Sequence, residues 1–586
     1  MEQPDETSMH EADKAAIHQK ALQLPATSAE TELSWWQRAV FYEIYVRSFK
    51  DSNDDGIGDL NGITSKLDYL SDLGIDAIWL TPFYPSPQVD FGYDISDFKN
   101  VDSQFGTLND FDLLVGEAHK RNIRVICDLV LNHTSDHHSW FVESRSSRNS
   151  PKRDWYIWAD PKHGGPPNNW SSAFGPTAWK WDQRTEQYYY HFFHEAQPDL
   201  NWRNPAVENA MFDAMRFWLA HDVDGFRLDS LNCLFKDLHL RDNPVLPRLR
   251  PGSRTEHEQE LKYNVDQPEI HSLLRRMRTA TEEYAKGRVL IGEVWTKTLD
   301  DLARYYGSQS DQIQIAFNFF FANVPKLNAV LFHTQVEQKN EALRGKWTAY
   351  VLSSHDMPRA YDRYGDGVHN DRIAKLLGIM LLTLRGTPFI YYGEEIGMVT
   401  AEPRIISEVQ DPLGKQYWPV KKGRDGARTP MQWDTSANYG FSGHTPWLSL
   451  APGDATRNVA AQIADPHSIL SLYRRVIRLR RHSPALHSGD YRSAGDNPSV
   501  FTYWRATPHQ SMLIALNMSP ESQELRLDFA LPRSVGEFRQ VLDNLNTEAQ
   551  GVVKHKLRLS PYQAVVLELQ TRGVVEGSRG TAEATF

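Results

Sequence analysis

The chain has 586 residues, a formal net charge of -11 at pH 7, and 17 tryptophans and 24 tyrosines. This length exceeds one ordinary hydrophobic core, so two or three domains are expected. The acidic balance argues against a nucleic-acid partner and favours a neutral substrate. Cys127 and Cys233 are the only cysteines. Their apolar surroundings indicate reduced core residues, so we expect a cytoplasmic protein without a disulfide framework.

Both ends of the chain have the composition of disordered tails. Residues 1–34 are polar and acidic, and residues 571–586 are rich in Gly, Glu, Ser and Thr. No run approaches the length of a membrane span, so no membrane partner is expected. Between the tails, β-rich runs alternate with helical periodicity. Eight strands are predicted, at Val40–Val46, Ala77–Leu80, Arg124–Leu129, Gly225–Leu228, Val289–Glu293, Gln314–Phe317, Ala349–Leu352 and Pro388–Tyr391.

Eight strands that alternate with helices favour an α/β fold with a closed (β/α)₈ TIM barrel. An open doubly wound sheet is the alternative, but no Gly-rich phosphate loop follows the first strand. The segment Asn132–Asn204 is crowded with aromatic residues, which is typical of a functional insertion. Beyond about Ser488, short alternating strands indicate an antiparallel β domain. The predicted units are a barrel (35–132 and 205–487), an inserted domain after strand 3 (133–204) and a C-terminal domain (488–570).

The run from Val223 to Ser230 is predicted to be a buried parallel strand that delivers Asp229 to its C-terminal end, which is the catalytic end in barrel enzymes. Arg227 lies two residues earlier, so both side chains share one face of the strand. A nearby arginine favours the ionised form of a carboxyl group, and an ionised carboxylate in a pocket is a nucleophile. A purely structural ion pair is the alternative.

Three further stretches carry polar groups at predicted strand ends: Asp128–His133, Gly292–Trp295 and Ser353–Asp356. Together with Gly225–Asp229, and in this order, they resemble the four sequence signatures of the alpha-amylase family of glycoside hydrolases and transglycosidases. The resemblance extends from about Trp35 to Leu569. It implies a catalytic barrel, an inserted domain after the third strand, a C-terminal β-sandwich, and no organic cofactor.

The resemblance also implies roles for individual residues. Asp229 would be the nucleophile, Glu293 the acid/base and Asp356 the stabiliser of the transition state. Burial between Ile291 and Val294 would raise the pKa of Glu293 and keep its proton until bond cleavage. His133 and His355 match family histidines that hydrogen-bond the glucose in subsite -1, where Arg227 also belongs to the substrate-binding set.

Two further stretches, Asp90–Asp97 and Gly423–Trp433, resemble the alpha-glucosidase and oligo-1,6-glucosidase branch. There Asp90 and Arg428 would hold the outer hydroxyls of the terminal glucose, and Tyr93 would stack on its ring. Arg424 is an open alternative to Arg428. Charged groups that cap the pocket imply exo action on short substrates. Ser230, which follows the nucleophile, favours α-1,4 or mixed linkages such as those of maltose or sucrose.

The segment Asp51–Asp59 alternates oxygen ligands around a glycine, as loops that wrap Ca²⁺ or Mg²⁺ do. It resembles the divalent-ion loop of the same branch, and a solvated acidic turn is the alternative. The ion would have a structural role, because no predicted catalytic acid belongs to the loop. The implied ligands are Asp51, Asn53, Asp55, the Ile57 carbonyl and Asp59.

The sequence therefore predicts a retaining, exo-acting α-glucosidase that acts on a small oligosaccharide or disaccharide, as a monomer or homodimer. A transglucosylase or isomerase, of the sucrose isomerase or trehalose synthase type, is the alternative with the same chemistry. A catalytically dead, glucosidase-like binding protein is the alternative from another class.

Overall fold

The computed structural model describes residues 33–246, 259–284, 287–453, 455–527, 537–545, 553 and 555–570. Nearly all of the two predicted tails lies outside these residues. Leu33 and Ser34 are the exceptions. Ser34 precedes helix α2 (Trp35–Arg38), and its backbone N–H donates to Gln37 Oε1 at 2.9 Å. The described residues therefore begin two positions before the predicted start of the barrel.

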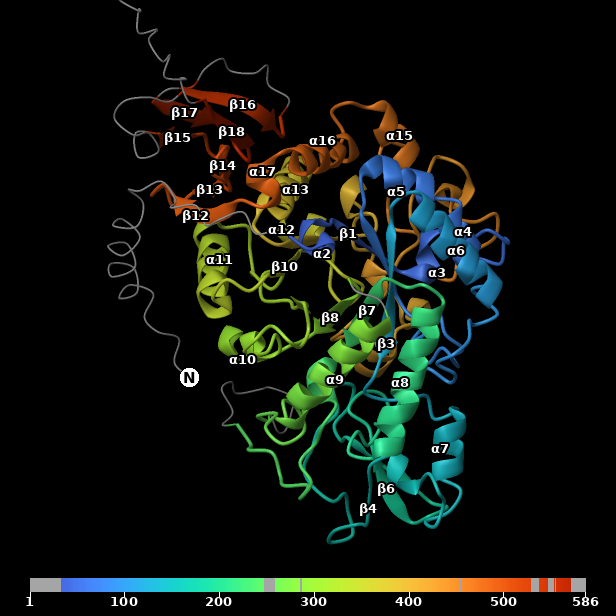
Figure 1. Ribbon diagram of the computed structural model, residues 1–586. Helices are drawn as coiled ribbons and strands as arrows, with labels where there is room; N and C mark the ends of the chain where they lie inside the picture. The colour runs from blue at the N-terminus through green and yellow to red at the C-terminus, as the bar shows by residue number, and fades with distance from the viewer. Residues whose placement is uncertain are drawn as a thin grey trace, which may run out of the picture.

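Eight parallel strands form the barrel, in the order β10-β11-β1-β2-β3-β7-β8-β9 (Figure 1). The terminal strands of this order, β9 and β10, also lie against each other, so the barrel is nearly closed. The predicted fold class is confirmed. The bounds are β1 Phe41–Ile44, β2 Ala77–Leu80, β3 Arg124–Val130, β7 Gly225–Asp229, β8 Val289–Glu293, β9 Ile315–Phe317, β10 Ala349–Val351 and β11 Thr387–Tyr391.

Helices surround the barrel, and α8 shows how the sequence specifies them. The side chain of Asn204 accepts the backbone N–H of Ala206, and Pro205 occupies the first helical turn. Val207, Met211, Met215 and Trp218 are buried at helical spacing. The other helices are α3 Val46–Phe49, α4 Leu60–Thr64, α5 Leu67–Leu73, α6 Leu108–Lys120, α9 Glu269–Tyr284, α10 Leu299–Arg304, α11 Ala329–Leu343, α12 Ala360–Tyr364, α13 Asn370–Thr383, α14 Pro412–Tyr417, α15 Val459–Ala464, α16 Ile469–His482 and α17 Pro484–His487, with α8 at Pro205–Ala220.

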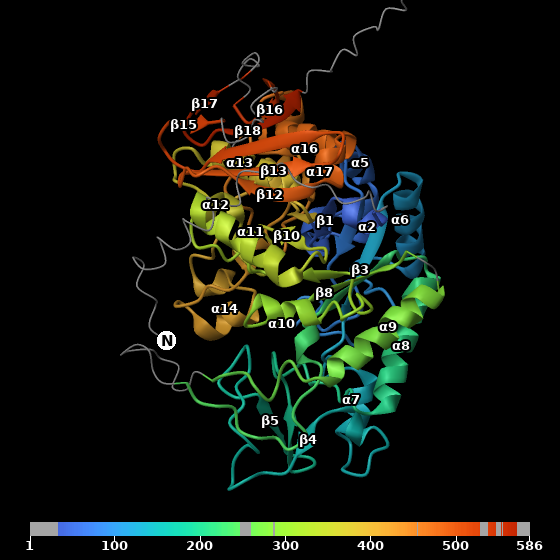
Figure 2. The same ribbon diagram turned by 60° about the vertical axis from the view of Figure 1, so that its left-hand side comes forward.

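The segment between β3 and α8 carries a small sheet of its own. Helix α7 (Ser139–Ser144) precedes three antiparallel strands in the order β4-β6-β5. Trp179 of β5 and Tyr190 of β6 form an aromatic cluster with Trp170. Figures 1 and 2 show β4 at the opposite end of the molecule from the C-terminal strands. The strands are β4 Trp158–Ala159, β5 Trp179–Asp182 and β6 Gln187–Tyr190.

The C-terminal part is antiparallel, as predicted. A five-stranded sheet (β12-β13-β14-β18-β16) and a two-stranded sheet (β15-β17) enclose a core that includes Leu513, Leu525 and Leu557. Arg505 Nη1 donates to Thr383 O at 2.5 Å and so ties β13 to the end of α13. The strands are β12 Asp490–Ala494, β13 Val500–Ala506, β14 Ser511–Asn517, β15 Gln523–Arg526, β16 Glu537–Asp543, β17 Lys556–Leu559 and β18 Ala564–Gln570. The exact domain boundaries stay a prediction.

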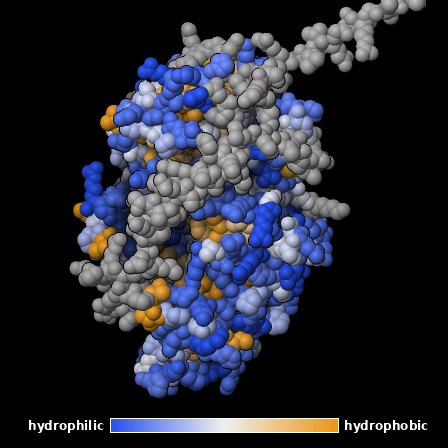
Figure 3. Space-filling view, turned by 90° about the vertical axis from the view of Figure 1, so that its left-hand side faces the viewer, coloured by the Kyte–Doolittle hydropathy of each residue, from blue (hydrophilic) through white to orange (hydrophobic). Residues whose placement is uncertain are grey.

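The face of the molecule in Figure 3 is mainly hydrophilic where described residues form it, and its hydrophobic side chains occur in small groups. Across the described ranges, none of the helices combines the length and the apolar character that crossing a bilayer requires. Cys127 and Cys233 are buried free thiols.

Candidate active site

Acidic side chains converge at the C-terminal ends of the barrel strands. Glu43 lies in β1, Asp128 in β3, Asp229 ends β7 and Glu293 ends β8, while Asp356 follows β10. The parallel register aligns these strand ends; for example, Asp128 lies opposite Arg227 on β7. Asp229 and Glu293 are only 6% and 5% exposed. The structure thus gathers the three predicted acids in one cluster, in which Asp229 and Glu293 are buried.

Arg227 lies at the centre of this cluster and is 1% exposed. Its Nη1 lies 2.6 Å from Asp229 Oδ1 and 2.9 Å from Asp128 Oδ1. Its Nη2 lies 2.7 Å from Glu293 Oε2. A single planar guanidinium therefore bridges Asp229 and Glu293 and sets their separation. The ion pair predicted within β7 exists, and it belongs to a larger network of one cation and three carboxyls.

The surroundings of Glu293 favour its protonated form. Burial raises its pKa to about 8, against the attraction of Arg227 and with the added repulsion of Asp229. Its Oε2 also accepts the backbone N–H of Ser230 at 3.0 Å. Ser230 can present this N–H because it adopts a left-handed conformation, with φ 44°, directly after β7. A carboxyl group with this pKa is mostly protonated at pH 7, as a general acid must be.

Asp356 has the opposite environment. Burial alone would raise its pKa, but the positive charges of Arg424 and Arg428 outweigh burial and hold the pKa well below its ordinary value. Arg424 Nη1 and Arg428 Nη2 both donate to Asp356 Oδ1, at 3.1 and 3.0 Å. The side chain stays 30% exposed. It is therefore an accessible anion at neutral pH.

His355 is fixed by a residue that the sequence analysis did not single out. Glu43 Oε1 accepts the backbone N–H of His355 at 3.2 Å and lies 2.6 Å from its Nδ1. On the other side, Tyr93 Oη lies 2.8 Å from His355 Nε2 and donates to Asp128 Oδ2 at 3.1 Å. Burial lowers the pKa of His355 to about 3, so its ring is neutral. The sequence does contain a signal for Glu43, because a charged residue inside the otherwise apolar first strand is unusual.

The structure pairs Asp90 with Arg424, the open alternative, and not with Arg428. Arg424 Nη2 lies 2.6 Å from Asp90 Oδ1, and a further carboxylate, Asp411, accepts from the same nitrogen at 2.8 Å. Arg428 is completely buried, and its Nε donates to the backbone carbonyl of His355 at 2.8 Å. The sequence spacing could not show which arginine, Arg424 or Arg428, pairs with Asp90, because both side chains reach Asp356.

His133 lies beside Tyr93 and Asp90, as the motifs predict. Its Nε2 lies 3.1 Å from the carbonyl oxygen of Tyr93. Gln197, from the segment between β6 and α8, lies 3.1 Å from the same nitrogen and donates to Asp90 Oδ2 at 3.2 Å. Burial lowers the pKa of His133 and keeps its ring neutral. The inserted segment thus contributes a residue, Gln197, that the motifs did not reveal.

The predicted cation loop forms a tight turn after α3. Asp51 Oδ2 accepts the backbone N–H of Gly56 at 2.8 Å, and Asp55 Oδ1 accepts that of Ile57 at 2.8 Å. Gly56 has φ 88°, and a Cβ there would lie 2.2 Å from Thr445 O. Asp59 caps α4 through the N–H of Gly62. The donors are all oxygens, which fits Ca²⁺ or Mg²⁺, but in the described part of the chain no three acidic, His or Cys side chains are grouped closely enough to hold a metal ion.

A parallel barrel whose C-terminal end holds two carboxyls bridged by one arginine, next to a third that stays ionised, has the architecture of a glycoside hydrolase. Residues 43–489 match the family model described as alpha amylase, catalytic domain. The chain belongs to the alpha-amylase family of glycoside hydrolases.

Relatives and solved structures agree with this assignment. A probable alpha-glucosidase of Rhizobium meliloti is 44% identical over 84% of this chain and 91% of its own length. An oligo-1,6-glucosidase of Parageobacillus thermoglucosidasius is 37% identical over 92% of this chain and 100% of its own. The crystal structure of an alpha-glucosyl transfer enzyme (40% identity, TM-score 0.85) and that of the trehalulose synthase of Pseudomonas mesoacidophila (34%, TM-score 0.83) each match 92% of this chain and 100% of their own.

The network predicts that replacing Arg227 by Met destabilises the fold in a pH-dependent way. Removing the shared cation leaves buried carboxyls unpaired, at a cost of about 3–5 kcal/mol at neutral pH. Burial already raises the pKa of Asp128 to about 7 and that of Glu293 to about 8, and loss of the cation raises both further. The penalty therefore grows as pH rises above the ordinary carboxyl range and shrinks as pH falls.

Thermal denaturation of the wild type and the Arg227→Met variant at pH 5 and pH 8 measures this effect. The deficit in melting temperature should be larger at pH 8. Arg216→Met is the matched control, because Arg216 is exposed and its ion pair is with another exposed side chain, Asp213. A deficit of equal size at both pH values would contradict the shared-cation account.

Proposed function

We propose that this protein is a retaining, exo-acting α-glucosidase that releases the non-reducing terminal glucose of short α-glucosides. The observation that carries the proposal is the Arg227 bridge between Asp229 and Glu293. One guanidinium can bridge two carboxyls only when they lie close together, and retaining glycosidases hold their acid pair about 5 to 5.5 Å apart. An inverting enzyme needs a wider gap to admit water.

In the proposed mechanism, Asp229 attacks the anomeric carbon while Glu293 gives its proton to the departing glycosidic oxygen. Glu293, now ionised, then removes a proton from water, whose oxygen attacks the same carbon and releases Asp229. The pKa of about 8 for Glu293 supports the first step. Asp356, kept anionic by Arg424 and Arg428, stabilises the positive charge that develops on the sugar ring.

The substrate-binding set consists of side chains around this acid pair. Neutral His133 and His355 offer hydrogen bonds to sugar hydroxyls, and Glu43 orients His355. The Asp90–Arg424 pair closes one side of the pocket, which supports exo action, and these contacts favour Arg424 over Arg428 for holding the outer hydroxyls of glucose. The full proposed set is Asp90, Tyr93, His133, Arg227, His355, Arg424 and Arg428.

For the substrates, Ser230 favours α-1,4 or mixed linkages, such as those of maltose or sucrose. Relatives named oligo-1,6-glucosidase and trehalose-6-phosphate hydrolase differ from one another in linkage, so the family alone leaves the choice to pocket residues. A transglucosylase is the second candidate. It is favoured by the similarity to the alpha-glucosyl transfer enzyme and to trehalulose synthase, one variant of which was solved with sucrose.

Glucose release and product identification from maltose, isomaltose, sucrose and trehalose test the proposal. Maltose or sucrose should yield glucose, and Asp229→Ala should lower kcat by on the order of 10⁴-fold because the nucleophile is lost. Glu293→Gln serves as the second inactive control. Products that are mainly new disaccharides, with little glucose, would favour the transglucosylase, and a wild type as inert as both variants would support the binding-protein alternative.

The pH dependence follows from Glu293. Because the free enzyme needs this carboxyl protonated, kcat/KM on maltose should fall as pH rises through about 8. An aryl glucoside with a good leaving group needs less proton donation, so its profile should be flatter on the alkaline side. An alkaline limb centred below about pH 6 would contradict the assignment of Glu293 as the acid.

We further propose that the loop Asp51–Asp59 binds a structural Ca²⁺ or Mg²⁺, a role that its oxygen donors and the turn at Gly56 support. EDTA should lower the melting temperature, and added Ca²⁺ or Mg²⁺ should restore it, with Asp55→Ala insensitive to both. An identical response of the variant and the wild type would contradict the site.

Free thiols at Cys127 and Cys233 support a cytoplasmic location. The predicted oligomeric state, a monomer or a homodimer, can be tested by light scattering.

A further inference from the structure

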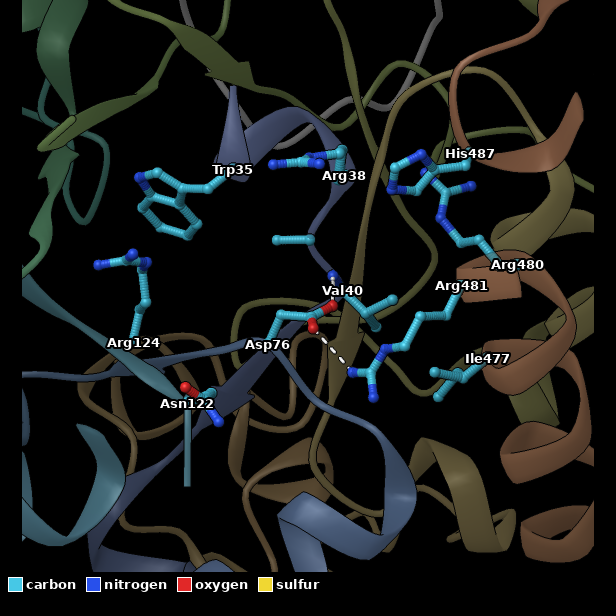
Figure 4. A pocket seen from close by; sticks show the side chains of 11 residues that line it. Trp35, Arg38, Val40, Asp76, Asn122, Arg124, Ile477, Arg480, Arg481 and His487 are labelled. Carbon is cyan, nitrogen blue, oxygen red and sulfur yellow. Dashed lines mark hydrogen bonds and ion pairs between the residues drawn. The ribbon is translucent and has the colours of Figure 1, made fainter. Parts of the chain in front are cut away.

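A cavity lies beside the N-terminal ends of the barrel strands, at the end of the barrel opposite the acid cluster. It has a volume of about 240 Å³ (Figure 4). Its wall includes residues that lead into three adjacent strands: Val40 precedes β1, Asp76 precedes β2 and Arg124 begins β3. The C-terminal end of α16 and His487 of α17 form the opposite wall.

The side chains around this cavity are mostly cationic, although the chain as a whole is acidic. Four arginines and one histidine face a single carboxylate, Asp76. Figure 4 shows these side chains arranged around a common space, with Arg481 reaching Asp76. The cationic lining residues are Arg38, Arg124, Arg480, Arg481 and His487.

Two of the four arginines form ion pairs with carboxylates, and the described residues provide no ion pair for the other two. Arg481 Nη2 lies 2.8 Å from Asp76 Oδ1, and Arg124 Nη1 lies 2.6 Å from Asp224 Oδ1. Arg480, which is 1% exposed, donates to main-chain carbonyls, including that of Gly386 at 2.7 Å, and its buried Nε has no hydrogen-bond partner among the described residues. Arg38 is exposed, and the described part of the chain supplies it with no ion pair or hydrogen bond.

The pKa of His487 responds to the positive charges around the cavity. Burial, which is the largest cause, and the positive charges of Arg480, Arg38 and Arg505 together lower the pKa of His487 to about 4. Its ring is therefore neutral at pH 7, because a further cation is disfavoured there. An anion that entered the cavity would be attracted by the same charges.

We propose that this cavity binds the phosphate group of a small metabolite. A guanidinium offers parallel N–H donors that match phosphate oxygens, and two uncompensated arginines supply the charge. The volume equals that of about eight water molecules at ~30 Å³ each, so it admits a phosphate together with a few further atoms. The Trp35 ring, on which Arg124 stacks at 4.7 Å, provides an apolar wall for those atoms.

Binding would connect parts of the chain that are distant in sequence. Arg38 lies in α2, and Arg480 and Arg481 lie in the last turn of α16. A ligand that contacts both ends stabilises the folded state by mass action, and the catalytic acids at the far end of the strands are untouched.

Isothermal titration of the full-length protein at low ionic strength tests the proposal, with inorganic phosphate and glucose 6-phosphate as probes and glucose as the uncharged control. Both phosphates should bind, and glucose should give no heat that depends on Arg38. Arg38→Gln should weaken phosphate binding roughly five- to tenfold, since one charge-assisted contact is lost. Arg184→Gln, which removes another exposed arginine from the turn between β5 and β6, should bind as the wild type does, and all three proteins should hydrolyse maltose equally.

The two probes separate the sources of the phosphate group. Tighter binding of glucose 6-phosphate would identify a sugar ester as the ligand class, and equal affinities would identify free phosphate. Absence of saturable binding, or equal affinities of wild type and Arg38→Gln, would overturn the proposal. Binding that appears only after deletion of residues 1–32 would also overturn it, because the acidic stretch before Trp35, with Glu30 and Glu32, would then be the natural occupant.

Discussion

The buried guanidinium of Arg227 is the constraint on which the site depends. Transfer of this cation from water is costly, and only well-placed carboxylates can offset that cost. Asp128 holds it from β3, while its Nη1 also contacts Asp229 and its Nη2 contacts Glu293. Because the guanidinium is planar and rigid, the spacing of the two acids follows from the positions of its nitrogens. A lysine, as a single point charge on a flexible stem, could not impose that spacing.

The same network explains how neighbouring carboxyls acquire different protonation states. Arg227 is shared by three carboxyls, so its charge cannot neutralise all of them, and burial raises the pKa of Glu293 to about 8 and that of Asp128 to about 7. Asp356 instead accepts from two arginines, Arg428 and the Arg424 that it shares with Asp90 and Asp411, and stays ionised. Environments that push two pKa values apart define an acid and an anion within one pocket. The ratio of arginines to carboxyls around each group thus determines its chemistry.

The barrel and the acid cluster were predictable, because both are encoded locally. Each strand is a short apolar run, and each predicted catalytic acid ends or follows one, so the closure of the barrel brings them together. The role of Glu43 could not be predicted, because it depends on a contact with His355, which is 312 residues away in the sequence. Arg424 and Arg428 are equally suitable by sequence, and only the fold distinguishes the one beside Asp90 from the one behind His355. The loop Asp51–Asp59 shows the reverse case, in which a recognisable pattern folds mainly around its own backbone amides.

The two ends of the barrel use arginine in opposite proportions. Around Arg227 the carboxyls outnumber the cation, which suits a neutral sugar whose transition state becomes positive. Around the N-terminal cavity the cations outnumber Asp76, which suits an anion. Strands β1 and β3 take part in both environments, since Glu43 and Asp128 lie on strands whose N-terminal ends adjoin the cavity. The length of the strands separates the acidic cluster around Arg227 from the cationic cavity. Each cluster therefore affects mainly the groups buried beside it, and solvent screens the interaction between the two clusters.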